Sequence, residues 1–195
     1  MTAPRCLVPP VGAAAGAARQ FRAELPCLAT ARLDLRPATL DDFPLWSEIF
    51  AAPDAGAIGG PLNAEGAWDE FCVYVAGWLL HGHGLWAAVR RTDERLLGFA
   101  LLGLEWSDRE PEIGWIFAEE AHGLGYATEA AMAVRDHAAA LLGPGSAVSY
   151  IDPANAASIE LAIRVGATRD PAAEAALGDG TQVWRHGAAR AEATA

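Results

Sequence analysis

The stretch that most constrains this chain runs from residue 112 to residue 130. It begins with an apolar run of strand length, Glu112 to Phe117, and continues through a short joint, Ala118 to Ala121. Gly123 and Gly125 then open onto apolar residues with helical spacing. The pattern predicts a strand, a turn and a helix N-terminus. The first N–H groups of a helix lack partners within it, and glycines allow close approach, so this corner suits a phosphate.

The spacing of apolar residues predicts the other elements. Strands are expected at residues 31–37, 85–91, 96–106, 112–117, 147–152 and 181–186. Helices are expected to include residues 43–50, 68–79, 127–142 and 156–165. Thr39 or Asp41 can cap the first helix, and Asp54 to Asn63 has the composition of a flexible flap. The second helix should bury a stripe made of Trp68, Phe71, Cys72, Val75, Trp78 and Leu79.

Charge and composition exclude several classes of protein. The net charge of −11 argues against broad nucleic-acid contact and favours a cationic partner. All 14 basic residues are arginine, so phosphate-binding loops that require Gly-Lys-Ser/Thr and Schiff-base lysine chemistry are both excluded.

The chain length of 195 residues favours one domain, and cysteine usage favours a reducing compartment. Cys6, Cys27 and Cys72 are far apart and odd in number, which favours neither a disulfide framework nor a metal site. His81 and His83 are better explained as helix-ending residues than as metal ligands, because no third ligand is nearby.

No apolar run is long enough to span a bilayer, so we expect a cytoplasmic protein without membrane contact. We expect a flexible leader at residues 1–29, one domain at 30–187 and a frayed tail at 188–195.

Two motifs in order give the chain a family resemblance. His122, Gly125 and Ala127 match a phosphate loop of the form Gln/Arg-x-x-Gly-x-Gly/Ala, and Asn155 and Ser158 match a later Asn-x-x-Ser/Ala helix that ends at a glycine, here Gly166. With the strand at residues 31–37, this order resembles the GNAT N-acetyltransferases, in particular their RimJ/RimL-type branch. The resemblance covers roughly residues 30 to 187.

The resemblance implies a fold and a cofactor. The fold would be α/β (α+β), a single domain whose mixed, mostly antiparallel sheet of about six to seven strands is flanked by about four helices. Acetyl-coenzyme A would be the co-substrate, with no metal. Its expected contacts are Trp115, Ile116, Phe117, His122, Gly123, Leu124, Gly125, Tyr126, Ala127, Thr128, Asn155 and Ser158. Asn155 would contact the pantetheine arm or cap its helix, and a backbone N–H near Trp115 or Ile116 would hold the thioester oxygen.

The resemblance also suggests catalytic residues. Glu112 is the first candidate for a general base, with Glu105 and Asp152 as alternatives. Many relatives protonate the leaving thiolate with a tyrosine at the position of Ala162; Tyr150 or Ser158 could replace it, or no acid is needed.

Two functions remain open at this point. The first is an N-acetyltransferase acting on a primary amine, either a protein N-terminus or a small cationic amine, by direct attack in a ternary complex. The alternative is a weakly active or inactive acyl-coenzyme A-binding sensor or partner module. A dinucleotide site fits less well, because Thr128 replaces the third glycine of that motif. The acceptor is not determined by the sequence, and the protein would be a monomer or homodimer.

Overall fold

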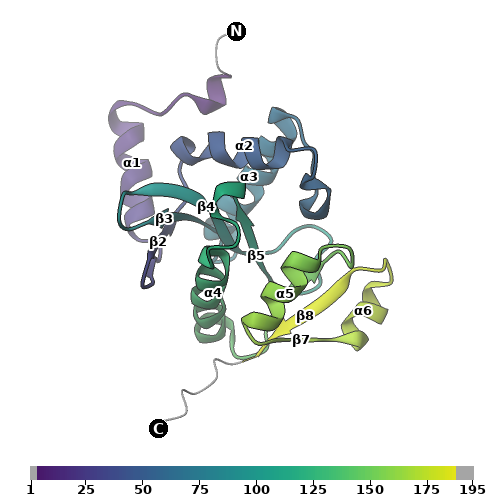
Figure 1. Cartoon of the computed structure of the whole chain (residues 1–195). Helices are drawn as coiled ribbons and strands as arrows, with labels where there is room; N and C mark the ends of the chain where they lie inside the picture. The colour runs from purple at the N-terminus through teal and green to yellow at the C-terminus, as the bar shows by residue number, and fades with distance from the viewer. Residues whose placement is uncertain (1–3, 188–195) are drawn as a thin grey trace.

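One eight-stranded sheet is the centre of the fold (Figure 1), a computed structural model that describes residues 4–187. The strand order is β1-β2-β3-β4-β5-β6-β8-β7, and every neighbouring pair is antiparallel except β5 and β6. The strands are β1 (Leu28–Ala29), β2 (Leu33–Pro37), β3 (Leu85–Arg90), β4 (Arg95–Gly103), β5 (Glu112–Phe117), β6 (Ala147–Ile151), β7 (Ala167–Arg169) and β8 (Gln182–His186).

Helices cover both faces of this sheet (Figure 1). They are α1 (Gly12–Ala23), α2 (Phe43–Ala51), α3 (Ala64–Leu80), α4 (Tyr126–Leu142), α5 (Ala156–Arg164) and α6 (Pro171–Leu177), with 3-10 turns η1 (Arg5–Leu7), η2 (Leu40–Asp42), η3 (Ala55–Ile58) and η4 (Glu119–Ala121). α2 and α3 pack on one face of β3 and β4, and α4 packs on the other. The C-terminal elements α5, β7, α6 and β8 extend the sheet beyond β6.

The period-two alternation of the strands divides the core between these faces. Leu101 packs with Trp46 and Phe99 against α2 and α3, whereas its neighbour Leu102 packs with Val134 against α4. Trp46 is fully buried and donates from its indole Nε1 to the Ala67 oxygen at 2.9 Å, so its only polar atom is satisfied.

The sheet opens where its two parallel strands meet. Glu112 and Val148 form the one backbone pair between β5 and β6, and beyond it the strands separate. The Ser149 hydroxyl continues the connection by donating to the Ile113 oxygen at 2.5 Å, and it accepts from Nε2 of the buried His186 at 2.8 Å. The hydrogen bond from the Ser149 side chain therefore replaces a backbone hydrogen bond between β5 and β6 just before the gap begins.

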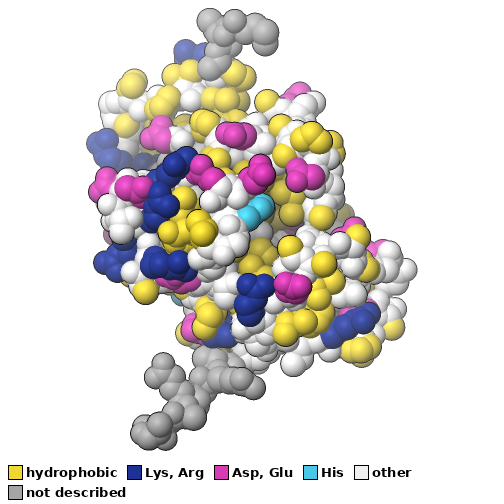
Figure 2. All heavy atoms as spheres, viewed as in Figure 1, with side chains coloured by type: hydrophobic (Ala, Val, Ile, Leu, Met, Phe, Trp, Pro, Cys, Tyr) yellow, Lys and Arg dark blue, Asp and Glu magenta, His cyan; other side chains and the backbone are white. Residues whose placement is uncertain are grey.

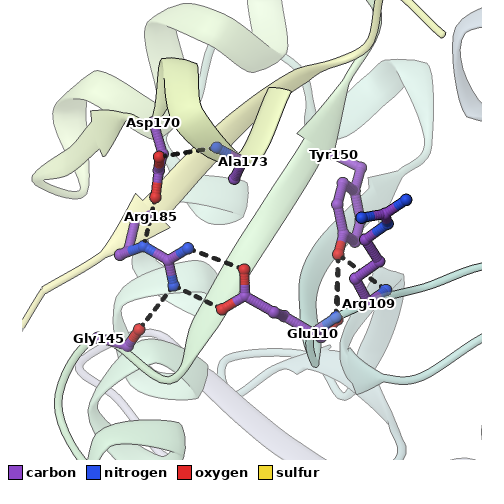
Figure 3. Close-up of polar contacts among 7 residues, drawn as sticks. All are labelled: Arg109, Glu110, Gly145, Tyr150, Asp170, Ala173 and Arg185. Carbon is purple, nitrogen blue, oxygen red and sulfur yellow. Dashed lines mark hydrogen bonds and ion pairs between the residues drawn. The ribbon is translucent and has the colours of Figure 1, made fainter. Parts of the chain in front are cut away.

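A single arginine joins the C-terminal part of the sheet to the turn before β5 (Figure 3). Arg185 on β8 binds both oxygens of Glu110 at 2.7 and 2.8 Å, Asp170 at 2.8 Å and the Gly145 oxygen at 2.9 Å. The hydrogen bond from Arg185 lowers the pKa of Glu110 below its ordinary value. On the other side of the same turn, the Tyr150 hydroxyl accepts from the amides of Arg109 and Glu110.

The observed class agrees with the sequence prediction, a single α/β domain with a mostly antiparallel sheet. All six expected strands and all four expected helices are present. The strand and helix totals are higher because β1, β7, α1 and α6 were not anticipated. These elements are short or, in the case of α1, bury no side chain, so they lack the apolar period on which the prediction depended.

One local expectation needs correction. Leu79 is 75% exposed, so it lies outside the stripe that α3 buries; Tyr74 faces the core instead. Of the two expected caps, Thr39 is the one used: it begins η2, which leads directly into α2, and its amide and hydroxyl donate to the Asp42 carboxylate. The leader expected at residues 1–29 includes α1 and β1, and the tail expected at 188–195 lies outside the described residues.

None of the helices that the structure describes is both long and apolar enough to cross a membrane.

The bonds of Arg185 generate a stability prediction. Arg185→Gln should lower the free energy of unfolding in urea by about 1–2 kcal/mol, because charge-assisted hydrogen bonds at a partly buried site are lost. Arg164→Gln is the control, since its ion pair with Glu160 is long at 3.5 Å and exposed. The pKa of Glu110 is lowered in the folded state, so the contribution is present at neutral pH and lost as the pH falls through that pKa. Equal losses in the two variants, or a gap that widens in acid, would contradict this account.

Candidate active site

The separation of β5 and β6 opens a cavity of about 640 Å³. Its walls come from the end of α2 and the η3 loop, from α3, from β4 and the turn after it, and from β5, β6 and the start of α5. Residues lining it include Phe50, Ile58, Glu70, Tyr74, Leu101, Glu105, Asp108, Glu112, Gly114, Trp115, Ile116, Ser149, Tyr150, Asp152, Asn155 and Ser158. The cavity therefore joins both faces of the sheet at the gap.

The alternation of β5 assigns its side chains to these faces. Ile116 packs with the α2–α3 cluster, and Glu112 and Gly114 share its face because they lie four and two residues before it. A Cβ at Gly114 would lie 2.9 Å from the Leu101 side chain, so a larger residue there would force Leu101 to move. The Glu112 carboxylate thus faces the chamber between the sheet and α3, which we call the acidic chamber.

The alternation along β5 also determines which neighbouring strand each of its peptide groups faces. The Ile113 oxygen accepts from Ser149 on β6, so the peptide groups of Ile113 face β6, and those of Trp115, two residues later, face the same way. Beyond the single backbone pair there is no strand opposite Trp115. Its N–H points into the gap, whereas that of Ile116 faces β4.

The acidic chamber raises the pKa of Glu112 to about 8. Burial is the main cause, and the nearby carboxylates Asp108 and Glu105 add to it; a weak hydrogen bond from the Tyr150 amide, at 3.4 Å, opposes it. A carboxylate with such a pKa takes up a proton near neutral pH far more readily than an ordinary glutamate.

Three further carboxylates line the chamber: Glu70, Glu105 and Asp108. Tyr74 donates its hydroxyl hydrogen to Glu105, and the Glu105 amide donates to Asp108 at 2.6 Å. Burial, together with repulsion from Glu105, raises the pKa values of Glu70 and Asp108. Across residues 4–187, no arginine or histidine forms an ion pair with any of the four chamber carboxylates. The chamber is therefore built for positive charge.

The α5 side of the gap carries Trp115 and two residues of the Asn-x-x-Ser motif. The Trp115 indole donates to the Ser158 hydroxyl at 3.3 Å, which leaves the hydroxyl hydrogen available to another acceptor. Asn155 caps α5, since its side-chain oxygen accepts from the Ser158 amide at 3.1 Å. Tyr150 differs, because its hydroxyl is bound to the 109–110 backbone (Figure 3).

The glycine corner adopts the predicted turn and helix start. Gly123 and Gly125 have φ of 71° and 80°, a region that glycine adopts without strain. Among the described residues, no hydrogen-bond acceptor contacts the amides from Gly123 to Thr128. His122 is exposed, and its Nε2 donates to the Phe117 oxygen at 2.9 Å, so that ring nitrogen is already engaged. This helix mouth lies outside the residues that line the cavity.

The structure thus brings Glu112, Trp115, Ile116, Tyr150, Asn155 and Ser158 to one cavity, together with the alternative bases Glu105 and Asp152. Phe117 is instead buried under α4, and residues 122–128 form the separate helix mouth. Sequence reasoning missed Glu70, Tyr74 and Asp108. Glu70 and Tyr74 are four residues apart on α3, so their shared face was a usable signal. Asp108 had none, because its position depends on how the turn before β5 folds.

No group of three or more potential metal ligands lies together within residues 4–187.

Comparisons with known proteins identify the family of this chain. Residues 32–168 match the family model described as the acetyltransferase (GNAT) domain. An acetyltransferase from Agrobacterium tumefaciens is 35% identical, with a TM-score of 0.78 over 84% of this chain and 95% of its own. A GNAT-family acetyltransferase from Bordetella pertussis is 24% identical, with a TM-score of 0.66 over 84% of this chain and 99% of its own.

The fold is also similar to that of RimL, a ribosomal alpha-N-protein acetyltransferase solved with coenzyme A. The two chains are 15% identical, with a TM-score of 0.65 over 84% of this chain and 98% of RimL. The comparison with curated proteins gave no match. Since the family match extends over well more than half of the sequence, this chain is an acetyltransferase of the GNAT family.

Proposed function

We propose that the protein transfers an acetyl group from acetyl-coenzyme A to a primary amine by direct attack in a ternary complex. The observation that carries the proposal is Glu112, a carboxylate with a pKa of about 8, which faces an acidic chamber at the point where β5 and β6 separate. A base with that pKa is matched to removing a proton from an amine near neutral pH.

The donor would occupy the gap and the helix mouth. The unpaired amides from Gly123 to Thr128 suit the diphosphate, because helix N-termini attract anions. The pantetheine arm would follow the gap, with the side-chain amide of Asn155 beside it. That RimL has been solved with coenzyme A supports a donor of this kind.

The acceptor would be a cationic amine in the acidic chamber. Glu70, Glu105, Asp108 and Glu112 supply negative charge that no arginine within residues 4–187 neutralises by an ion pair. Both a protein N-terminus and a small cationic amine fit this chemistry, and RimL, as its name states, acts on an alpha amine. An α-amino group is the easier acceptor, since freeing its base form at pH 7 costs about 1 kcal/mol, against about 4–5 kcal/mol for a lysine side chain.

The reaction then needs three contributions from the chain. Glu112 accepts the proton as the amine nitrogen attacks the thioester carbonyl carbon. The N–H of Trp115, which points into the gap, holds the carbonyl oxygen as negative charge develops on it. As the carbon–sulfur bond breaks, the Ser158 hydroxyl gives its hydrogen to the thiolate and is reprotonated from solvent, to which Glu112 releases the proton that it took from the amine. Ser158 suits this role better than Tyr150, whose hydroxyl is bound to the 109–110 backbone.

Two observations favour the alternative, an acyl-coenzyme A-binding module with little or no activity. The Nε2 of His122 bonds to the Phe117 oxygen, and Ala162, at the position where many relatives carry a tyrosine, is fully buried. Any turnover with an amine acceptor, measured as release of free thiol, excludes that alternative.

The donor assignment predicts a specific effect at Gly125. Gly125→Ala should weaken acetyl-coenzyme A binding by about tenfold in calorimetry, because a side chain at φ 80° costs about 1–2 kcal/mol and shifts the amides of the mouth. Gly145→Ala is a matched control, since Gly145 has the same φ of 80° with no atom near its would-be Cβ. Absence of binding to the unaltered protein at millimolar donor would refute the assignment.

The pKa of Glu112 predicts the pH profile. Glu112 acts only when ionised, so kcat/KM should rise with pH and level off above about 8. Glu112→Gln should lower kcat/KM by about 10²- to 10⁴-fold. The increase of kcat/KM with pH that remains in this variant should come only from deprotonation of the acceptor amine. Asp152→Asn, at the exposed alternative base, should keep the wild-type profile. A Glu112→Gln enzyme with an unchanged profile would show that another group is the base.

The hydroxyl geometry predicts different effects for the two candidate acids. Ser158→Ala should lower kcat by about tenfold or more while KM for the donor changes little, because the hydroxyl acts as the bond to sulfur breaks. Tyr150→Phe should lower thermal stability through the lost bonds to the 109–110 backbone and leave kcat within about threefold. The reverse pattern would assign the proton to Tyr150.

A further inference from the structure

The helix mouth lacks a cation of its own. Residues 122–128 contain no arginine, and the one side chain there that could carry charge, His122, bonds to the Phe117 oxygen. Leu124, at the tip of the turn, is 53% exposed and apolar. If a diphosphate binds at this mouth, the turn itself offers only backbone N–H groups.

The sheet topology brings arginines to this same edge from other strands. β5 ends at Phe117, which pairs with Gly98 near the start of β4. β3 ends at Arg90, which pairs with Leu33, the first residue of β2. Arg32, Arg90, Arg91 and Arg95 therefore all belong to the edge where α4 begins. Figure 2 shows arginine side chains, with acidic ones between them, gathered on the side where Figure 1 draws β2 and β3.

Of these four, Arg32 reaches the mouth itself. Its Nη1 donates to the Leu124 oxygen at 2.9 Å, and its guanidinium lies 4.4 Å from the centre of the Tyr126 ring. Its Nη2 would lie 3.4 Å from a Cβ built on Gly125, so the guanidinium borders the glycine whose φ is 80°. No hydrogen-bond acceptor within residues 4–187 contacts Nη2.

A partly buried carboxylate holds Arg32 in this place. Glu129, in the first turn of α4, accepts from the Arg32 amide at 2.7 Å and from its Nε at 2.6 Å, and it also accepts from the Thr30 hydroxyl. The Glu129 side chain is 17% exposed, against 45% for Arg32. One edge of the guanidinium is thus fixed to the helix, and its other N–H groups remain at the surface beside the turn.

From this geometry, and resting on the proposed acetyl-coenzyme A donor, we propose that Arg32 binds the donor's diphosphate at the mouth of α4. From the position just before β2, it supplies the cationic hydrogen-bond donors that His122 does not supply from the turn. The Glu129 carboxylate offsets the positive charge of Arg32. Arg32 therefore acts mainly through the direction of the N–H groups that remain on its guanidinium, and the planar shape of that group matters more than its charge alone.

The test compares two donors that differ in their phosphates. Arg32→Gln should raise the Kd for acetyl-coenzyme A about 10- to 100-fold, the usual range for a charge-assisted hydrogen bond. It should change KM for S-acetyl-pantetheine, which carries no phosphate, less than about twofold. Arg32→Lys should recover only part of the loss. Arg95→Gln removes a somewhat more exposed charge at the same edge, where it pairs with Glu120, and should change both constants little.

Each outcome decides the proposal. An unchanged Kd in Arg32→Gln, equal losses in Arg32→Gln and Arg95→Gln, or equal losses with both donors would overturn the role of Arg32 and leave the proposed function intact. Failure of the unaltered protein to bind acetyl-coenzyme A would overturn both. If Arg32→Gln does not fold, Arg32→Lys serves in its place, since it keeps the charge and most of the stem, and a loss of binding confined to acetyl-coenzyme A would support the proposal.

Discussion

The rest of the molecule depends on one interruption in the sheet. Between β5 and β6 a single backbone pair, Glu112 with Val148, is followed by strands that separate. Unpaired backbone groups inside a protein cost free energy unless something binds them, and here they face an open gap. Ser149 and His186 set where the ladder stops, and Trp115 joins the two sides by reaching Ser158. The fold thus leaves backbone N–H groups of β5 facing the gap, where a ligand can bind them.

The direction of β5 places opposite chemistry at its two ends. The strand starts at Glu112 among carboxylates that form no ion pair with an arginine of residues 4–187, and it ends at Phe117 beside the edge that carries Arg32. A cationic acceptor and an anionic donor would therefore approach the same strand from different ends and meet near its middle, at the amide of Trp115. This separation matters in a chain with a net charge of −11, whose general field would otherwise repel the donor.

Much of this arrangement could be predicted from the sequence, because local patterns determine it. The run 112–117, the glycine turn and the period of α4 were sufficient to locate the strand, the mouth and the candidate base Glu112. What could not be predicted depends on contacts between distant segments. Arg32 lies 97 positions before its anchor Glu129, and the bond from His122 to the Phe117 oxygen depends on how the turn between them folds. The elements β7 and α6 are too short to show a period.

The walls of the acidic chamber come from segments that contribute nothing to the mouth of α4. η3, the facing side of α3 and the turn around Asp108 line the chamber, and Arg185 holds that turn from β8. On the proposed function, substitutions in these segments would reshape the acceptor pocket while the residues proposed to bind the coenzyme stay unchanged. A related chain could then change its preferred amine through these three segments alone and keep its binding of the acyl donor throughout.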